Sequence, residues 1–276
     1  MKNQDCFSVA EKIAVITGGL GQIGAEFVRE YLGRGARVAV FSRNVSESKR
    51  KSVFAPELLI SPSLMFCAVD ITDRLSINKA LDEVEAEWGI PCVLINNAGL
   101  DTQPSAPPEV SGPFEDFPED VFREVVEVNL VGTFLMTQAV GARMAKNGGG
   151  SIINVGSIYG MVSPVQDIYA YKKEQTGVPF VKPVAYAAAK SGLYNLTRYC
   201  ATYWGKMGVR VNTLTPSGVF RDTQDKEFQR NYCNRIPIGR MAQPDEYNGA
   251  AIFLGSDASR YMTGSNLIID GGWTAW

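Results

Sequence analysis

Short apolar runs alternate along the whole chain with longer segments whose apolar residues recur at helical spacing. The short runs are rich in β-branched residues and end at polar or glycine residues, which is typical of buried strands. We predict seven strands, at Lys12–Thr17, Arg37–Phe41, Leu64–Val69, Cys92–Ile95, Ser151–Val155, Val209–Thr215 and Leu267–Ile269. Because helical segments separate them, the strands should lie parallel in one doubly wound α/β sheet. We expect one domain, 1–276, because no repeat or linker interrupts the pattern.

Two helices carry the clearest predictions about burial. The segment Glu119–Lys146 is apolar nearly all round, so we expect it to be buried. The helix from Tyr186 to about Met207 should face the core with a stripe made of Leu193, Leu196, Cys200, Tyr203 and Met207. By contrast, Phe220–Asn234 is polar and is predicted to be a flexible helical flap.

The segment 161–185 does not fit the alternation of strands and helices. It is interrupted by prolines and is both aromatic and basic, with Tyr169, Tyr171, Lys172, Lys173 and Lys182. A long loop in a compact domain is usually a lid or a binding loop. We predict a lid-like insert, and packing between subunits is the alternative.

A glycine-rich turn, Thr17–Gly24, joins the first strand to a helix. Strand, glycine turn and helix form the context that a dinucleotide-binding motif requires. Gly18 permits the tight turn, Gly21 lets the backbone approach a pyrophosphate, and Gly24 lets the helix pack on the sheet. The phosphates would lie at the helix N-terminus, against Leu20, Gln22 and Ile23. A glycine turn without a ligand is the alternative.

The second strand ends in Ser42 and Arg43, where an NAD site usually has an acidic residue. An arginine can instead bind a 2′-phosphate, so the sequence favours NADP(H) over NAD(H).

Other strand ends supply further candidate cofactor contacts. Asp70, followed by Ile71, could bond an adenine amine, and Thr72 or Asp73 would cap the next helix. The turn at Pro216–Val219, with Gly218, could meet the nicotinamide amide.

Asparagine residues stand where amides are costly to bury. Asn96 and Asn97, with Ala98 and Gly99, should tie strand ends together and hold the next loop over the cofactor. Asn129 lies inside the apolar helix and must find hydrogen bonds, to backbone at a helix distortion, to an ordered water, or to both.

Tyr186 and Lys190 lie one helical turn apart and project from the same face. An ammonium close to a phenol favours the phenolate and lowers the pKa of the tyrosine. Such a pair is a candidate acid/base, and Ser157, at the end of the fifth strand, should lie at the same sheet edge.

Composition removes several classes of function. The chain has no histidine, which excludes a Ser-His-Asp hydrolase and any histidine-bearing metal site. The net charge of −2 gives no basic excess for nucleic acid, and no apolar run reaches the ~18 residues of a membrane span. The N-terminus lacks the apolar core of a secretory signal, and the five cysteines form no C-x-x-C pair. We therefore expect a cytoplasmic protein with reduced thiols, a small-molecule substrate and no metal.

Together the motifs resemble those of the short-chain dehydrogenase/reductase family over almost the whole chain. The resemblance rests on Thr17–Gly24, Asn96–Gly99, Asn129, Ser157 with Tyr186 and Lys190, and the tail Arg235–Trp273. It implies a Rossmann-like fold and an NAD(P)-dependent enzyme that interconverts a secondary hydroxyl and a carbonyl, with a sugar or sugar phosphate as the candidate substrate.

Residue roles also follow from the resemblance. Tyr186 would be the acid/base, Lys190 would hold the nicotinamide ribose, Ser157 would polarise the substrate oxygen, and Asn129 would position a water. The family also implies a homodimer or homotetramer formed through the two long helices around Asn129 and Leu196.

This chain departs from the usual family member at three places. Gln22 replaces a glycine, the turn at residues 216–218 reads Pro-Ser-Gly, and the segment between Ser157 and Tyr186 is long. The insert and the ending GGWTAW are similar to those of oxidoreductases of bacterial surface-sugar or flagellin-glycosylation pathways. Two other hypotheses stay open: a sugar-nucleotide epimerase or dehydratase with tightly bound NAD, and a non-catalytic NADP(H)-sensing module.

Overall fold

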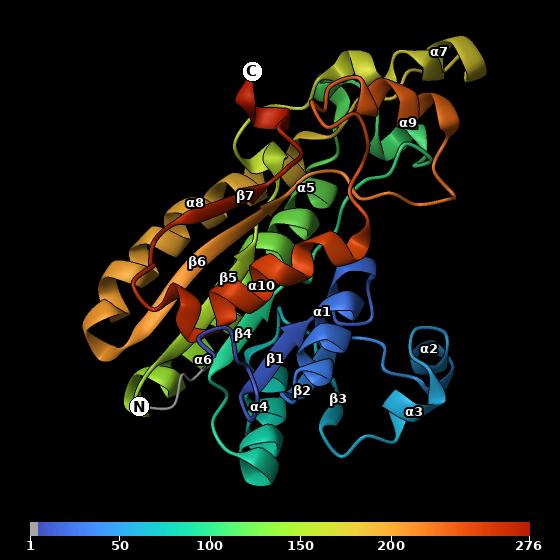
Figure 1. Ribbon diagram of the computed structural model, residues 1–276. Coiled ribbons are helices and arrows are strands. Elements are labelled where there is room, and N and C mark those ends of the chain that lie inside the picture. Colours follow the sequence, from blue (N-terminus) through green and yellow to red (C-terminus); the bar gives the residue numbers. More distant parts are fainter. Residues whose placement is uncertain (1–4) are drawn as a thin grey trace.

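A seven-stranded parallel sheet forms the centre of the computed structural model, which describes residues 5–276 (Figure 1). The strand order is β3-β2-β1-β4-β5-β6-β7, so the order reverses between β1 and β4. The strands are β1 (Ile13–Thr17), β2 (Arg37–Ser42), β3 (Leu64–Ala68), β4 (Val93–Asn96), β5 (Gly150–Val155), β6 (Val209–Pro216) and β7 (Asn266–Ile269). The prediction of a doubly wound parallel sheet is confirmed.

Helices cover both faces of the sheet. One face packs against α1 (Gln22–Gly33) and α10 (Asn248–Gly255). The other face packs against α4 (Arg74–Trp88), α6 (Thr133–Lys146) and α8 (Val184–Trp204). The remaining helices are α2 (Glu47–Lys51), α3 (Pro56–Leu59), α5 (Glu119–Val126), α7 (Tyr171–Thr176) and α9 (Lys226–Cys233).

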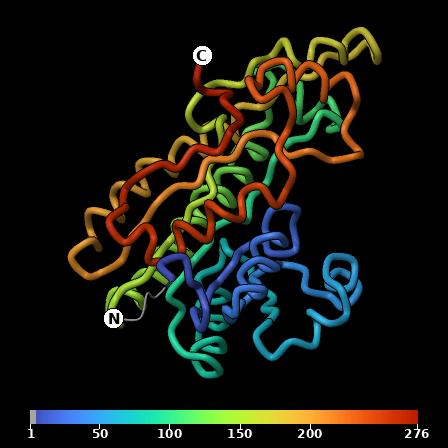
Figure 2. The backbone as a smooth tube through the Cα atoms, in the orientation of Figure 1, coloured from blue at the N-terminus to red at the C-terminus, as the bar shows by residue number. Residues whose placement is uncertain are grey.

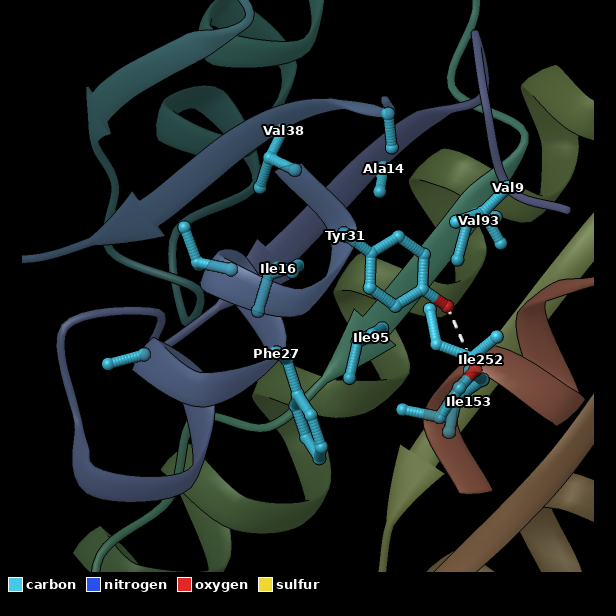
Figure 3. Packing of buried hydrophobic residues seen from close by; sticks show 14 of the residues in the cluster. Val9, Ala14, Ile16, Phe27, Tyr31, Val38, Val93, Ile95, Ile153 and Ile252 are labelled. Atoms are coloured by element: carbon cyan, nitrogen blue, oxygen red, sulfur yellow. Dashed lines mark hydrogen bonds between the residues drawn. The ribbon is translucent and has the colours of Figure 1, made fainter. Parts of the chain in front are cut away.

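Tyr31 joins α1 to α10 inside the first of these layers. Its ring lies among aliphatic side chains of the strands, and its hydroxyl donates a hydrogen bond of 2.9 Å to the carbonyl of Ala251 (Figure 3). A Cβ on Gly255 would lie 2.0 Å from this hydroxyl, so α10 can approach only because residue 255 is glycine. The phenol is therefore buried with its polar atom satisfied.

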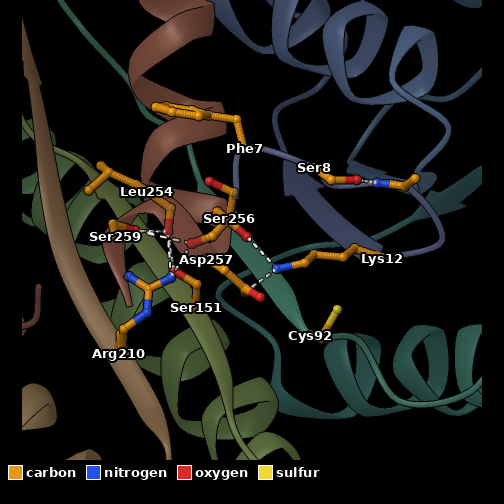
Figure 4. A network of polar contacts seen from close by, with 12 residues as sticks. Phe7, Ser8, Lys12, Cys92, Ser151, Arg210, Leu254, Ser256, Asp257 and Ser259 are labelled. Carbon is orange, nitrogen blue, oxygen red and sulfur yellow. Dashed lines mark hydrogen bonds and ion pairs between the residues drawn. The ribbon is translucent and has the colours of Figure 1, made fainter. Parts of the chain in front are cut away.

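A polar network satisfies the C-terminal end of α10 (Figure 4). The carbonyl of Leu254 accepts from Ser151 at 2.7 Å and from Arg210 at 2.8 Å, and the carbonyl of Gly255 accepts from Lys12 at 3.2 Å. Cations at a helix C-terminus bond its free carbonyls and oppose its dipole. The network fixes α10 against β1, β5 and β6.

The segment Glu119–Lys146 forms a continuous helix that includes a π-helical stretch, Glu127–Gly132. Within residues 5–276 it is the one helix long and apolar enough to cross a membrane, judged on length and composition alone, and 44% of its most apolar window is buried in the protein. Core helices of globular proteins have the same length and composition, and α6 packs against the sheet here. The prediction of burial all round is wrong, because Phe134 is 40% exposed.

The predicted inward stripe of α8 is correct only in part. Leu193 and Cys200 are buried, whereas Tyr203 and Met207 are 61% and 49% exposed. After Cys200 it is Trp204, not Tyr203, that turns inward, against Gly141 of α6, and Met207 lies beyond the end of α8.

The insert and the segment after β6 lie together at one end of the molecule, beside the loop after β4 (Figure 2). The insert contains α7, and α9 lies next to it, joined by a 3.7 Å ion pair between Lys172 and Asp225. The segment predicted as a polar flap is better packed than expected, because Phe228 and Tyr232 of α9 are buried among the aromatic residues of the insert.

Candidate active site

One cleft of about 610 Å³ runs along the carboxyl ends of the central strands, from the glycine turn to α8. It crosses the point where the strand order reverses, which is where open α/β sheets bind ligands. Nearly all the predicted site residues line it: Gly18, Leu20, Gly21, Gln22, Ile23, Ser42, Arg43, Asp70, Ile71, Asn97, Ala98, Gly99, Ser157, Tyr186, Lys190, Pro216, Gly218 and Val219. Gly24 and Asn129 lie behind its wall.

The glycine turn has the shape that a phosphate requires. Gly18 has a φ of +64°, and a Cβ there would lie 2.9 Å from Cα of Ala98. A Cβ on Gly24 would lie 2.4 Å from the carbonyl of Gly18, so this glycine lets α1 pack on the turn. The N-cap of α1, Gly21, provides no side-chain cap, which leaves first-turn N–H groups directed at the cleft. These residues fit a dinucleotide pyrophosphate.

Gln22, which departs from the family pattern, connects the glycine turn to the segment after β6. Its amide nitrogen donates to the carbonyl of Phe220 at 2.6 Å, and its oxygen accepts from Arg221 at 2.5 Å. The side chain therefore holds one rim of the cleft to the other.

The end of the cleft near β2 is basic. Arg43 and Lys49 are exposed and line it, together with Ser42 and Asn44. Asp70 is part of the same wall, where Thr72 donates to its carboxylate from both the backbone (2.9 Å) and the hydroxyl (2.7 Å). These bonds lower the pKa of Asp70, so it is ionised and accepts hydrogen bonds.

The two adjacent asparagines connect three strand ends. Asn96 donates to Asn154 on β5 at 2.9 Å, and Asn97 donates to the carbonyls of Thr17 and Gly18 at 3.1 and 3.2 Å. After β3, Asp73 caps α4 by accepting from the N–H of Leu75.

Asn129 lies fully buried in the π-helical stretch. Its oxygen accepts from the N–H of Leu100 at 2.7 Å, and its nitrogen donates to the carbonyl of Leu100 at 2.8 Å. The amide thus pairs with backbone of the loop after β4 and fixes where that loop leaves the sheet.

Ser157, Tyr186 and Lys190 meet at the other end of the cleft. The backbone carbonyl of Ser157 accepts from Tyr194 at 2.8 Å, which anchors the turn after β5 to α8. The ammonium of Lys190 lies 5.7 Å from the centre of the Tyr186 ring and donates to the carbonyl of Val155 at 2.7 Å.

Burial controls the ionisation of this group. It raises the pKa of Tyr186 well above the usual range; the carboxylate of Asp101 adds to the effect, and hydrogen bonding from Ser157 opposes it. Burial also lowers the pKa of Lys190 to about 8. The expectation that the pKa of Tyr186 is lowered is not met, because burial, the largest cause, raises it.

One backbone donor of the turn after β6 is already used within the protein. The N–H of Gly218 already donates to the hydroxyl of Tyr232 at 2.8 Å, so it is not free for a nicotinamide amide. A Cβ at residue 218 would lie 2.5 Å from the Tyr232 ring, which explains the glycine.

Several residues that line the substrate end were missed among the predicted site residues: Asp101, Tyr159, Tyr169, Lys182, Phe228 and Tyr232. Tyr169 stacks on Phe228 with ring centres 5.7 Å apart, which makes one wall aromatic. The aromatic and basic composition of the insert was a signal for Tyr169 and Lys182, but it did not say which side chains face inward.

No metal-binding cluster accompanies these groups. Across residues 5–276 no three Cys, Asp or Glu side chains gather closely enough to hold a metal ion, and the cysteines form no disulfide.

The chain matches the family model described as short chain dehydrogenase over residues 12–231. It is 34% identical over 273 residues to D-threitol dehydrogenase of Mycolicibacterium smegmatis, covering 97% of this chain and 95% of the relative. It is 31% identical over 281 residues to gluconate 5-dehydrogenase of Gluconobacter oxydans, with 99% of each chain covered.

Solved structures of dehydrogenases are also similar to this chain. A short chain dehydrogenase from Leptospira borgpetersenii with bound NAD+ superposes with a TM-score of 0.84 at 35% identity, covering 99% of this chain and 97% of that one. A gluconate 5-dehydrogenase from Burkholderia cenocepacia in complex with NADP and tartrate superposes with a TM-score of 0.83 at 30% identity, covering 99% and 98%.

Proposed function

The chain belongs to the short-chain dehydrogenase family and is an oxidoreductase, and from that premise we propose that it interconverts a secondary hydroxyl and a carbonyl of a polyhydroxylated substrate with NADP(H). The observation that supports this most strongly is the single cleft that joins a phosphate-shaped glycine turn to Tyr186, Ser157 and Lys190. The dehydrogenase relatives match over nearly their full length, which favours this function over an epimerase, a dehydratase or a sensing module.

A nicotinamide cofactor would supply or accept hydride at the substrate carbon. Tyr186 gives the proton to the substrate oxygen during reduction and removes it during oxidation. Because its pKa is raised, the phenol stays protonated at neutral pH, which suits reduction. Ser157 hydrogen-bonds the same oxygen and orients it.

Lys190 and Asn129 support this proton transfer. Lys190 would hold the cofactor ribose, and because burial lowers its pKa to about 8, its ammonium would release a proton more readily than an exposed lysine. Asn129 positions the loop at Leu100, and its amide keeps one further N–H for the water that a proton relay needs.

The basic end of the cleft supports NADP(H). Arg43 can bind a 2′-phosphate with its planar fork, and Lys49 adds a second positive charge. Asp70 would accept a hydrogen bond from the adenine amine. No acidic side chain follows β2 to accept the ribose hydroxyls of NAD.

The proposal also covers the insert, the assembly and location of the protein, and the substrate class. The residues 161–185 form a lid-like insert on a single catalytic domain. The protein is a cytoplasmic homodimer or homotetramer formed through α5–α6 and α8, where Phe134, Tyr199 and Tyr203 are exposed. The substrate belongs to sugar chemistry, in line with the threitol and gluconate named for the relatives, and the surface-sugar pathway stays a prediction.

The test is an assay of the purified protein with NADP+ and NAD+ against tetritols, pentitols, hexitols, aldonic acids and simple secondary alcohols. We expect nucleotide reduction with at least one polyol or aldonic acid, faster with NADP+ than with NAD+. No reduction with any of these alcohols, and no oxidation of NADPH or NADH with the corresponding ketones, would overturn the proposal.

A further inference from the structure

Asp101 and Lys182 form an ion pair at the substrate end of the cleft. They come from two separate segments, the loop after β4 and the end of the insert. The ammonium of Lys182 donates to Asp101 Oδ1 at 2.6 Å and to the carbonyl of Thr102 at 2.7 Å. The side chain of Lys182 is 5% exposed and that of Asp101 is 35% exposed, so the lysine is the buried partner.

The position of the pair is fixed relative to the acid/base. Gln166 accepts from the backbone N–H of Lys182 at 2.9 Å and donates to its carbonyl at 3.2 Å. The ammonium lies 5.6 Å from the centre of the Tyr186 ring, and both members of the pair line the cleft beside Ser157. A substrate whose oxygen reaches Tyr186 and Ser157 therefore extends toward this pair.

Each member keeps hydrogen-bonding capacity that the protein does not use fully. An ammonium has three donors, of which Lys182 uses two on Asp101 and Thr102. The second oxygen of Asp101 meets only Gln103, at 3.3 Å. One donor and one acceptor thus remain next to each other.

The charges of the pair cancel, and this decides which group it suits. A carboxylate or phosphate would be attracted to Lys182 but repelled by Asp101. A hydroxyl group can donate to the carboxylate and accept from the ammonium at the same time. Hydroxyl groups are therefore the chemical group that both partners bind favourably.

Resting on the proposed function, we propose that Asp101 and Lys182 are specificity-determining residues that bind the hydroxyl group on the carbon next to the reacting one. The enzyme then selects vicinal diols and polyols over simple secondary alcohols. A simple alcohol leaves this donor and acceptor without a partner in the closed site, which weakens its binding.

The experiment compares butane-2,3-diol with butan-2-ol, which differ by this one hydroxyl, as substrates of the wild-type protein and of Lys182→Met and Asp101→Asn. We expect the wild type to prefer the diol in kcat/KM. Each substitution should lower the ratio of kcat/KM for the diol to that for butan-2-ol about 10- to 100-fold, because any effect on Tyr186 acts on both substrates alike and cancels in the ratio. Melting temperatures identify variants that are unfolded, and Lys182→Arg, which retains charge and donors, should keep most of the preference for the diol.

Lys172→Met is the matched control. Lys172 also joins the insert to a neighbouring segment, through Asp225, but neither residue lines the cleft. We expect its diol preference to equal that of the wild type.

Two results would overturn the inference while leaving the proposed function intact. One is equal kcat/KM of the wild type for diol and simple alcohol. The other is an equal fall for both substrates in Lys182→Met and Asp101→Asn, which would mean that the pair only clasps the two loops. A wild type inactive toward every alcohol with either nucleotide would instead remove both proposals.

Discussion

The two ends of the cleft are built in different ways. At the nucleotide end, backbone makes the site: Gly18 takes a positive φ, Gly24 allows the close approach of α1, and Asn97 bonds the carbonyls of the turn. At the substrate end, side chains from distant segments make it, such as Asp101, Lys182 and Tyr232. The first end depends on steric rules that act over a few residues. The second depends on how the tertiary structure brings loops together, so its chemistry can change without change to the fold.

The largest effect is expected at Tyr186, where the two ends meet. Tyr186→Phe removes the proton donor and keeps the ring, so turnover should fall about 10³-fold. Nucleotide affinity should change by less than about threefold, since the phenol is not part of the phosphate site. Steady-state kinetics and a nucleotide titration by fluorescence measure the two quantities.

Tyr199→Phe makes the same chemical change at a tyrosine of α8 that is 65% exposed. Its turnover should match that of the wild type. Equal turnover of Tyr186→Phe and Tyr199→Phe would remove the acid/base role assigned to Tyr186.

The second largest effect is expected from Gly24→Ala, which disturbs only the nucleotide end of the cleft. Gly24→Ala places a methyl group 2.4 Å from the Gly18 carbonyl, which belongs to the turn, and 2.6 Å from the amide nitrogen of Asn97, which holds the turn. We expect the affinity for NADP(H) and NAD(H) to fall about 100-fold, because the turn must move away from its phosphate-binding shape.

Gly33→Ala, at the end of the same helix, meets nothing within 4 Å and is the matched control. Calorimetric titration measures the nucleotide affinity of both variants. An affinity of Gly24→Ala close to that of Gly33→Ala would show that the glycine turn does not hold the nucleotide.

The third effect concerns the choice of nucleotide. Arg43→Ala should lower the ratio of kcat/KM for NADP+ to that for NAD+ about 10-fold, because one charge-assisted contact to the 2′-phosphate is lost. Arg37→Ala removes an arginine from the opposite end of β2, where it pairs with Glu11, and should leave the ratio unchanged. A ratio unaffected by Arg43→Ala would contradict the preference for NADP(H).

The smallest effect is a pH dependence of stability. The pKa of Lys190 is lowered to about 8 in the folded protein, from an ordinary value of 10.5. Between these values only the unfolded chain binds the proton, so Lys190 makes the free energy of unfolding rise with pH there. Lys190→Met should lose about 2 kcal/mol of this rise between about pH 7.5 and 9.5, measured by urea unfolding. Identical pH profiles for both proteins would contradict the lowered pKa.

The same contrast explains what could be predicted from the sequence. The strands were located to within a residue or two, since β-branched apolar runs such as Lys12–Thr17 have no other stable place than the centre of a sheet. Ser157 and Tyr186 were placed at one edge because the ends of parallel strands meet there. Tyr203 and Met207 were misplaced because periodicity does not show that Trp204 turns inward in place of Tyr203, or that α8 ends before Met207.

The missed residues share one physical cause. Lys182 and Asp101 are far apart in the chain and become a pair only when the insert folds over the loop after β4. Likewise, the bond between Gly218 and Tyr232 depends on where α9 packs. Neither contact follows from local propensity or spacing. The hydrogen bonds of the Asn96 and Asn129 side chains, by contrast, do follow, because buried amides need partners.

The central claim is that one cleft joins the nucleotide to the proton donor. Following hydride from the nicotinamide to the substrate carbon tests this claim most directly. The measurement is a reaction of the wild-type protein with NADPH deuterated at C4, on either face, and the ketone of a polyol that it oxidises, followed by mass spectrometry of the product. The account predicts one deuterium on the new carbinol carbon from one of the two labelled faces. Product without deuterium from either label, or no product at all, would contradict it.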